Sequence, residues 1–274
     1  MGTSKQFPTP SGGPWTPLKN DISDYLDGDK NVTPQHIVGG TVRALGGLGV
    51  PSPGRASAAS GRGTSGRGSG GGGGGGGSRG GASGGRASVG RAASGLAGFG
   101  AAVREGGLDA GLNALGLAEL RGRPAAEVID RIADRLAEGT DPTQYDLLTD
   151  ALKAAILEAA ALEEANGFAD LDSALQSFLE RHGVEGLVQS YLSNYVHARV
   201  WMAVENHVEM KTAGGPSAEA MSIAVANACR SHVESLIQET KDAGRFDNMD
   251  WFGRDGTKLG NELVAELEGR LKAQ

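Results

Sequence analysis

A long glycine-rich segment constrains the fold of this chain more than any other feature of the sequence. Residues 52–95 contain 19 glycines, six arginines and no acidic residue. Nearly all of their side chains are small, so the segment has little apolar surface to offset the entropy lost on ordering. We therefore expect a disordered Gly/Ser/Arg-rich linker over 52–95, with a root-mean-square reach of roughly 35–40 Å. It would separate an extended N-terminal tail with short helices (1–51) from an α-helical domain (96–274).

Outside the linker, apolar residues recur at three- and four-residue spacing, and no strand-like alternation of any length occurs. This pattern predicts an all-α fold, a bundle of roughly six helices. Residues 1–20 are expected to be extended, because their four prolines disfavour helix. The expected helices are 20–27, 34–45, one beginning at Pro124, 142–166, 169–182, 184–211, one following Ser217, and 257–272.

The charge distribution bears on whether the partner is a nucleic acid. Residues 96–274 contain 16 Lys or Arg and 29 Asp or Glu, and this acidic balance argues against wrapping nucleic acid. The linker arginines suggest an RGG-like arm, but only Arg79-Gly80-Gly81 matches such a repeat and no aromatic residues interleave for base stacking. A tether is therefore the preferred interpretation of the linker, and weak nucleic-acid binding stays open as the alternative.

No constellation of catalytic residues stands out. The single cysteine, Cys229, lies in a helical alanine-rich run and is expected to be a buried thiol. His197 and His207 lie ten residues apart on one predicted helix and therefore point to different sides. A helical hydrolase in which they converge with Glu205 and His232 is the weaker alternative. We expect a non-enzymatic protein with no cofactor and no metal site.

The sequence also has no apolar stretch of about 18 residues that could span a bilayer and no signal-peptide pattern, so we expect a cytoplasmic protein. One aromatic segment, 246–253, is unusual for a loop between helices. It contains two phenylalanines, a methionine and a tryptophan. Such clusters are enriched at protein interfaces, which makes Trp251 and Phe252 candidate partner-binding residues. Folding back of the segment onto the core is an equally good interpretation.

The first residues suggest a different kind of site. Removal of Met1 before the small Gly2 is expected to be efficient and would leave an unhindered α-amine, whose ordinary pKa is about 7.7–8.0. Such an amine is a good acceptor for an activated acyl group. N-myristoylation is disfavoured, because Gln6 stands where that motif has Ser or Thr.

The N-terminal sequence MGTSK, followed by a Pro/Gly/Ser stretch and then WTPLK at 15–19, resembles the start of QatB proteins. These are components of the bacterial Qat anti-phage defence system, which also has a QueC-like enzyme, an ATPase and a TatD-like nuclease. The resemblance implies a non-enzymatic component whose Gly2 amine accepts a deazaguanine-type acyl group from the QueC-like partner. It further implies that Thr3, Ser4 and Lys5 are gripped in the enzyme's cleft.

In the same scheme, Trp15 and the prolines before it would dock along the partner, and the linker would let the tail reach the active site. The ATPase and the nuclease are further possible partners. Two alternatives remain beside modification at Gly2. One is a scaffold or adaptor that binds its partners without being modified, and the other is the weak nucleic-acid-binding module.

Overall fold

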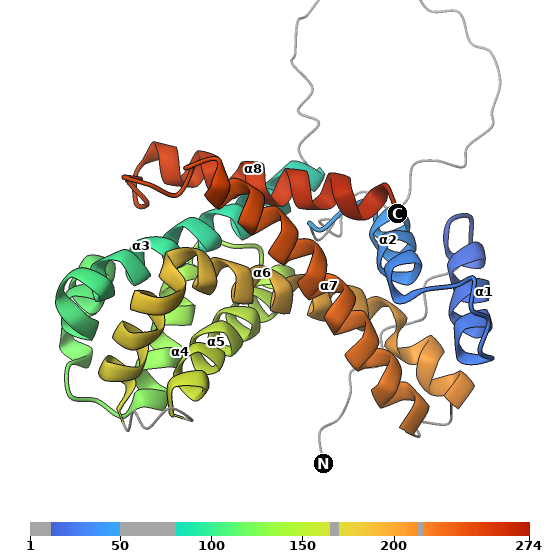
Figure 1. Cartoon of the computed structure of the whole chain (residues 1–274), viewed down its shortest axis with the longest axis horizontal. Coiled ribbons are helices and arrows are strands. Elements are labelled where there is room, and N and C mark those ends of the chain that lie inside the picture. The colour runs from blue at the N-terminus through green and yellow to red at the C-terminus, as the bar shows by residue number, and fades with distance from the viewer. Residues whose placement is uncertain (1–11, 50–80, 165–169, 213–215) are drawn as a thin grey trace, which may run out of the picture.

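The computed structural model describes residues 12–49, 81–164, 170–212 and 216–274. These residues form eight α-helices and one short 3₁₀ helix, and no strand occurs among them (Figure 1). The prediction of an all-α fold is therefore confirmed. The helices are α1 (Trp15–Leu26), α2 (Pro34–Leu45), α3 (Gly81–Leu115), α4 (Ala125–Leu136), α5 (Pro142–Glu164), α6 (Leu171–Thr212), α7 (Pro216–Asp242) and α8 (Arg254–Lys272), with the 3₁₀ turn η1 at Ala118–Leu120.

Local sequence signals explain the bounds of several helices. Thr33 caps α2: its hydroxyl accepts from the backbone N–H of His36, and the His36 ring accepts from the Thr33 N–H. Pro34 occupies the first turn of α2, and Gly46 ends the helix with a left-handed φ of 77°. The predicted helix 34–45 is therefore confirmed. A second left-handed glycine, Gly183 (φ 66°), interrupts the helical geometry within α6. The predicted break between 169–182 and 184–211 is therefore confirmed, with the two helical parts following each other directly across a kink.

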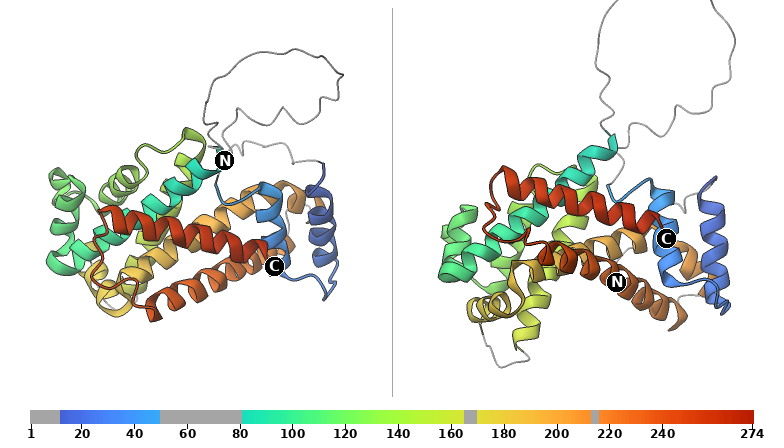
Figure 2. Two further views of the ribbon diagram at one scale, coloured as in Figure 1. Left: turned by 90° about the horizontal axis from the view of Figure 1, so that it is seen from above. Right: turned by 45° about the horizontal axis from the view of Figure 1, so that its top comes forward.

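Helix α6 runs through the middle of the molecule and contacts α3, α5 and α7 (Figure 1). Its core face is fully buried, with Tyr191 and Tyr195 among the largest side chains that are shielded from solvent. Helices α7 and α8 follow it in the chain, and α8 lies along α3 (Figure 2). The central helix therefore links the α3–α5 end of the molecule to the end that carries α1 and α2.

Two expected boundaries are wrong. Helix α1 begins at Trp15, so 15–20 are not extended; Pro17 fits because the first-turn N–H groups of a helix have no intrahelical acceptor. Helix α3 begins at Gly81, so the predicted linker ends too late. Residues from Val89 to Leu96 are largely buried in the core, where tertiary packing overrides a weak helix propensity. Residues 50–80 lie outside the described residues.

Small residues bring α3 and α8 into close contact. A Cβ atom added to Gly260 would lie 2.1 Å from the carbonyl oxygen of Gly90. A Cβ atom added to Gly90 would lie 2.6 Å from the backbone nitrogen of Asn261. The glycines that made this region look unstructured therefore allow two helix backbones to touch.

Helices α1 and α2 are part of the main body of the protein. Leu18 and Ile22 of α1 and Ile37, Val38 and Val42 of α2 belong to the same hydrophobic cluster as α3–α8. Helix α2 contacts α6, α7 and α8, and its C-terminal end lies beside the C-terminal end of α8 (Figure 2). The described part of the predicted tail thus shares one core with the helical domain.

Candidate functional site

The site of most interest is the point where the N-terminal residues join the folded body. Residues 1–11 lie outside the described residues, so the expectations for Gly2, Thr3, Ser4 and Lys5 stay predictions. The described chain begins at Gly12, whose carbonyl accepts from the Trp15 N–H at 2.9 Å. Trp15 is half-buried against the core at the first turn of α1. The predicted partner-binding residue Trp15 is therefore at least in part a packing residue.

Helix α1 is held on the body by both apolar and polar contacts. Leu18 and Ile22 are almost completely buried. The His207 ring donates from Nε2 to the Lys19 carbonyl at 3.3 Å, which joins α1 to the C-terminal half of α6. Burial lowers the pKa of His207 from its ordinary value, although the hydrogen bond to the Lys19 carbonyl acts in the opposite direction. The base of the N-terminal tail is thus fixed relative to α6.

A buried polar network holds both flanks of the glycine-rich segment. Tyr195 Oη of α6 donates to the carbonyl of Leu48 at 2.8 Å. Gln144 Nε2 of α5 donates to Tyr195 Oη at 2.8 Å and to the carbonyl of Gly85 at 3.0 Å. Leu48 precedes the segment 50–80 and Gly85 follows it. Both ends of the segment are therefore attached to one point on the body.

We call the contacts of Tyr195 and Gln144 with Leu48 and Gly85 the buried anchor, and Glu268 of α8 reinforces it. Its buried carboxylate accepts from the Leu48 N–H at 3.1 Å and from Lys272 Nζ at 2.6 Å. The Arg86 guanidinium lies 3.6 Å from the same carboxylate. Arg43 of α2 in turn donates to the Lys272 carbonyl at 2.9 Å. The end of α8 is therefore bonded to residues on both sides of the glycine-rich segment.

This anchoring changes the role expected for the linker. A linker fixed at both ends to the same body adds nothing to the distance that the N-terminus can travel. The reach of Gly2 is instead set by the chain from Gly2 to Trp15, which spans at most about 45 Å when fully extended. The hypothesis that 52–95 lets the tail reach a partner is therefore wrong.

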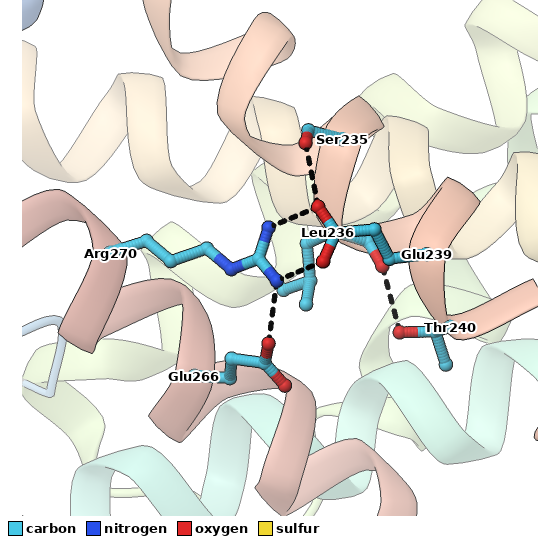
Figure 3. Close-up of polar contacts among 6 residues, drawn as sticks. All are labelled: Ser235, Leu236, Glu239, Thr240, Glu266 and Arg270. Carbon is cyan, nitrogen blue, oxygen red and sulfur yellow. Dashed lines mark hydrogen bonds and ion pairs between the residues drawn. The ribbon is translucent and has the colours of Figure 1, made fainter. Parts of the chain in front are cut away.

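A surface ion-pair cluster joins α7 to α8 (Figure 3). The Arg270 guanidinium donates to both carboxylate oxygens of Glu239, at 2.9 and 2.6 Å, and to Glu266 at 2.6 Å. Ser235 adds a hydroxyl donor to Glu239 at 3.0 Å. Hydrogen bonding from Arg270 lowers the pKa of Glu239 to about 2. The cluster keeps α8 in register on α7, and α8 in turn holds α2.

A groove lies beside the C-terminal end of α1. It has a volume of about 400 Å³ and runs between the α1–α2 turn and the first turns of α7. Its apolar wall comes from Tyr25, Leu26, Val32 and Met221. Its rim includes the exposed residues Asp29, Lys30 and Ala220. A groove of this composition can accept an apolar side chain from a protein partner.

A family model described as Qat anti-phage system associated protein QatB matches residues 76–250, more than half of the chain. The chain belongs to the QatB family. The matched range includes α3 to α7, whereas the motif on which the resemblance rested lies at residues 1–19. No curated protein and no solved structure matches the chain. No helix within the described ranges is long and apolar enough to cross a bilayer.

The QatB match ends within the aromatic segment 246–253, which divides into a buried and an exposed part. Phe246 and Trp251 are buried, with ring centroids 5.6 Å apart, and Ser94 donates to the Trp251 carbonyl. Trp251 therefore packs into this chain's own core, which agrees with the interpretation that the segment folds back onto the core, and its side chain is not exposed to a partner. Phe252 is 51% exposed over Gly98, and its role in binding stays a prediction.

The histidines of this QatB-family chain do not form a catalytic group. His197 lies 3.3 Å from the Ser222 hydroxyl on α7, whereas His207 faces α1. Among the described residues, no group of three or more His, Cys, Asp or Glu side chains could hold a metal ion. Cys229 is buried, and burial raises the pKa of its thiol to about 12. These positions support packing roles, and nothing about them favours the hydrolase alternative.

A polar pocket of about 350 Å³ lies between α5, α6 and α7. Two of its cations already have partners: Arg230 donates to Glu158 at 2.8 Å, and Lys241 lies 2.6 Å from Glu185. Ser190 also donates to Glu158. The sequence could not reveal this cluster or the anchor at Tyr195, because their residues come from helices far apart in the chain.

Proposed function

We propose that this chain is a non-catalytic component of a Qat anti-phage defence complex, and that its Gly2 amine is acylated by a QueC-like partner enzyme. Membership of the QatB family supports the defence role. The fixed base of the tail at Trp15 supports the acceptor role, because it ties a short N-terminal segment to a rigid body. This attachment is the observation on which the proposal mainly rests.

The proposed reaction is an acyl transfer. The partner activates a deazaguanine-type carboxylate as its adenylate. The unprotonated Gly2 amine attacks the carbonyl carbon, an N–C bond forms, the C–O bond to AMP breaks, and the amine loses a proton. Glycine suits this step because it has no Cβ to hinder the attack. Thr3, Ser4 and Lys5 would occupy the partner's cleft.

Mass spectrometry of the chain co-expressed with its QueC-like partner tests the proposal. We expect a mass increase on the N-terminal peptide that is absent when the enzyme is omitted. Gly2→Val keeps an α-amine but branches its Cα, so we expect it to reduce the modified fraction strongly. Gly13→Val, a matched change at the other end of the tail, should leave it intact. An unmodified N-terminus in the wild-type complex would refute the acceptor role.

Deletion of residues 2–6 separates this proposal from the scaffold alternative. Loss of phage defence with the complex still assembled supports a chemical role for the tail. Retention of both defence and assembly supports a scaffold that binds its partners without modification.

A further inference from the structure

We propose that the partner enzyme docks on the end of the molecule formed by α1, the α1–α2 turn and the first turns of α7, with the groove beside Tyr25 at its centre. This inference rests on the proposed function, since the partner is the enzyme that acts on Gly2. We call this region the α1/α7 face. It comprises the groove residues Tyr25, Leu26, Val32, Ala220 and Met221 with the acidic side chains around them.

The length of the tail limits where the enzyme can bind. Gly2 can lie at most about 45 Å from Trp15, and a tail that enters a cleft in extended form uses part of this length within the enzyme. Both flanks of 50–80 are bonded to the body, so that segment does not lengthen the reach of the N-terminus. The enzyme surface around its active site must therefore lie near α1. The groove meets this condition, because it lies one helix length from Trp15, about 18 Å.

The groove has the composition of a docking site. Tyr25, Leu26 and Val32 are only half-buried although they pack against the core. Ser217 and Ala220 on the α7 side are exposed and small, so they leave the groove open. An apolar side chain that enters this groove would cover the half-exposed aromatic and aliphatic surface.

The charge of this face indicates the chemistry of the partner. Asp24, Asp27 and Asp29 on and after α1, and Glu219 on α7, are exposed, and Lys30 is the single Lys or Arg that lines the groove. The four carboxylates outnumber this cation, so the face is acidic. In the described parts of the chain, none of these four carboxylates forms an ion pair with a Lys or Arg. The complementary surface is therefore basic, with an apolar residue at its centre. Such complementarity mainly speeds association and selects the partner.

A second apolar surface serves as the comparison. Phe252 is 51% exposed and lines a shallow groove at the start of α8. The C-terminal end of α8 contacts α2, so the start of α8 is the end of this helix that lies away from α2 (Figure 1). It is therefore farther from the base of the tail. Docking at Phe252 is the outcome that would compete with docking at the α1/α7 face.

The test measures affinity of the full-length chain for the purified QueC-like enzyme. Ala220→Arg places a long cation in the groove, and Asp24→Lys with Asp27→Lys reverses the charge of its rim. We expect each variant to weaken binding about tenfold or more, with the charge variant acting mainly on the association rate. Phe252→Arg probes the competing surface. The matched control is Leu157→Arg, at a 53% exposed residue of α5, which should stay within about twofold of wild type. All the altered side chains are exposed, and circular dichroism checks the fold.

The outcomes separate this inference from the proposed function. Normal binding by both groove variants would overturn the docking face, even if Gly2 is modified. Loss of binding by Phe252→Arg alone would overturn it as well. Weakened binding by the groove variants, with no modification of wild-type Gly2, would uphold the docking face and refute the acceptor role. Absence of binding by the wild-type chain would refute both.

A peptide substrate gives a second readout. A synthetic peptide of residues 2–14 contains the acceptor but lacks the groove. We expect its kcat/KM for modification to be about 100-fold below that of the full chain, because docking raises the effective concentration of the tail. Equal values for the peptide and the full chain would show that the body contributes nothing, and would overturn the docking face.

Discussion

Replacing Tyr195 with phenylalanine tests whether the buried anchor holds the flanks of the glycine-rich segment. The Tyr195 hydroxyl donates to the Leu48 carbonyl and accepts from Gln144 Nε2, both at 2.8 Å. Burial raises the pKa of Tyr195 to about 12, so the hydroxyl stays protonated and able to donate. Tyr195→Phe removes one oxygen atom and leaves the ring in place.

The expected cost follows from the groups that lose a partner. The Leu48 carbonyl loses this donor, whereas Gln144 keeps its bond to the Gly85 carbonyl. A buried group left unsatisfied costs about 1–3 kcal/mol, and the lost bonds add to this. We therefore expect Tyr195→Phe to reduce the free energy of unfolding by about 2–4 kcal/mol. Each kcal/mol should lower Tm by roughly 2–4 °C in a chain of this size.

Urea denaturation measures the loss, and hydrogen exchange locates it. Exchange should accelerate in the peptides that contain Leu48 and Gly85, ahead of the α4–α5 region. Tyr145→Phe is the matched control: its half-buried hydroxyl donates only to Asp134, at 2.8 Å, so it should cost less than about 1 kcal/mol. A Tyr195→Phe protein that is as stable as wild type, with unchanged exchange at both flanks, would refute the anchor.

Three further outcomes are expected. Gly260→Ala should destabilise the chain by about 1–3 kcal/mol or prevent folding, because its Cβ would meet the Gly90 carbonyl oxygen. Gly269→Ala is the control, since no atom lies within 4 Å of its added Cβ, and the urea midpoints of the two variants measure the difference. Deleting Gly70–Gly77 should leave Gly2 modification unchanged in intact-mass assays, but deleting 8–13 should abolish it. The opposite result would support the hypothesis that the glycine-rich segment lets the tail reach the partner. Burial lowers the pKa of His197, His207 and His232 in the folded chain. Below about pH 6.5 the unfolded chain therefore binds more protons than the folded one, and the free energy of unfolding decreases as the pH is lowered. A stability that is constant from pH 7.5 to 5.5 would contradict this.

Much of the helix content follows from the sequence because its signals are local. The Thr33 cap, Pro34 and Gly46 lie within α2 or beside it, and the structure places the helix between them. The amphipathic pattern of α8 is equally local, although the helix begins at Arg254, three residues before the expected start. Local patterns of this kind depend on no distant partner, which is why single-sequence inference finds them.

The start of α3 could not be found in this way. Its residues Val89, Ala92 and Ala93 are buried, but glycines and serines between them hide the helical period. Their burial depends on α6 and α8, which begin only at Leu171 and Arg254, far along the chain. The same limit applies to the anchor, since Leu48, Gln144 and Tyr195 show no pattern in sequence. Gly2 remains a prediction, because 1–11 lie outside the described residues.

The shared attachment point of Leu48 and Gly85 has a practical consequence. A protease cut, or a split of the gene, anywhere between them should yield two polypeptides that remain assembled as one particle. The shorter piece would keep the acceptor end together with α1 and α2. It could be made by peptide ligation with a labelled or altered first residue and then recombined with the larger piece.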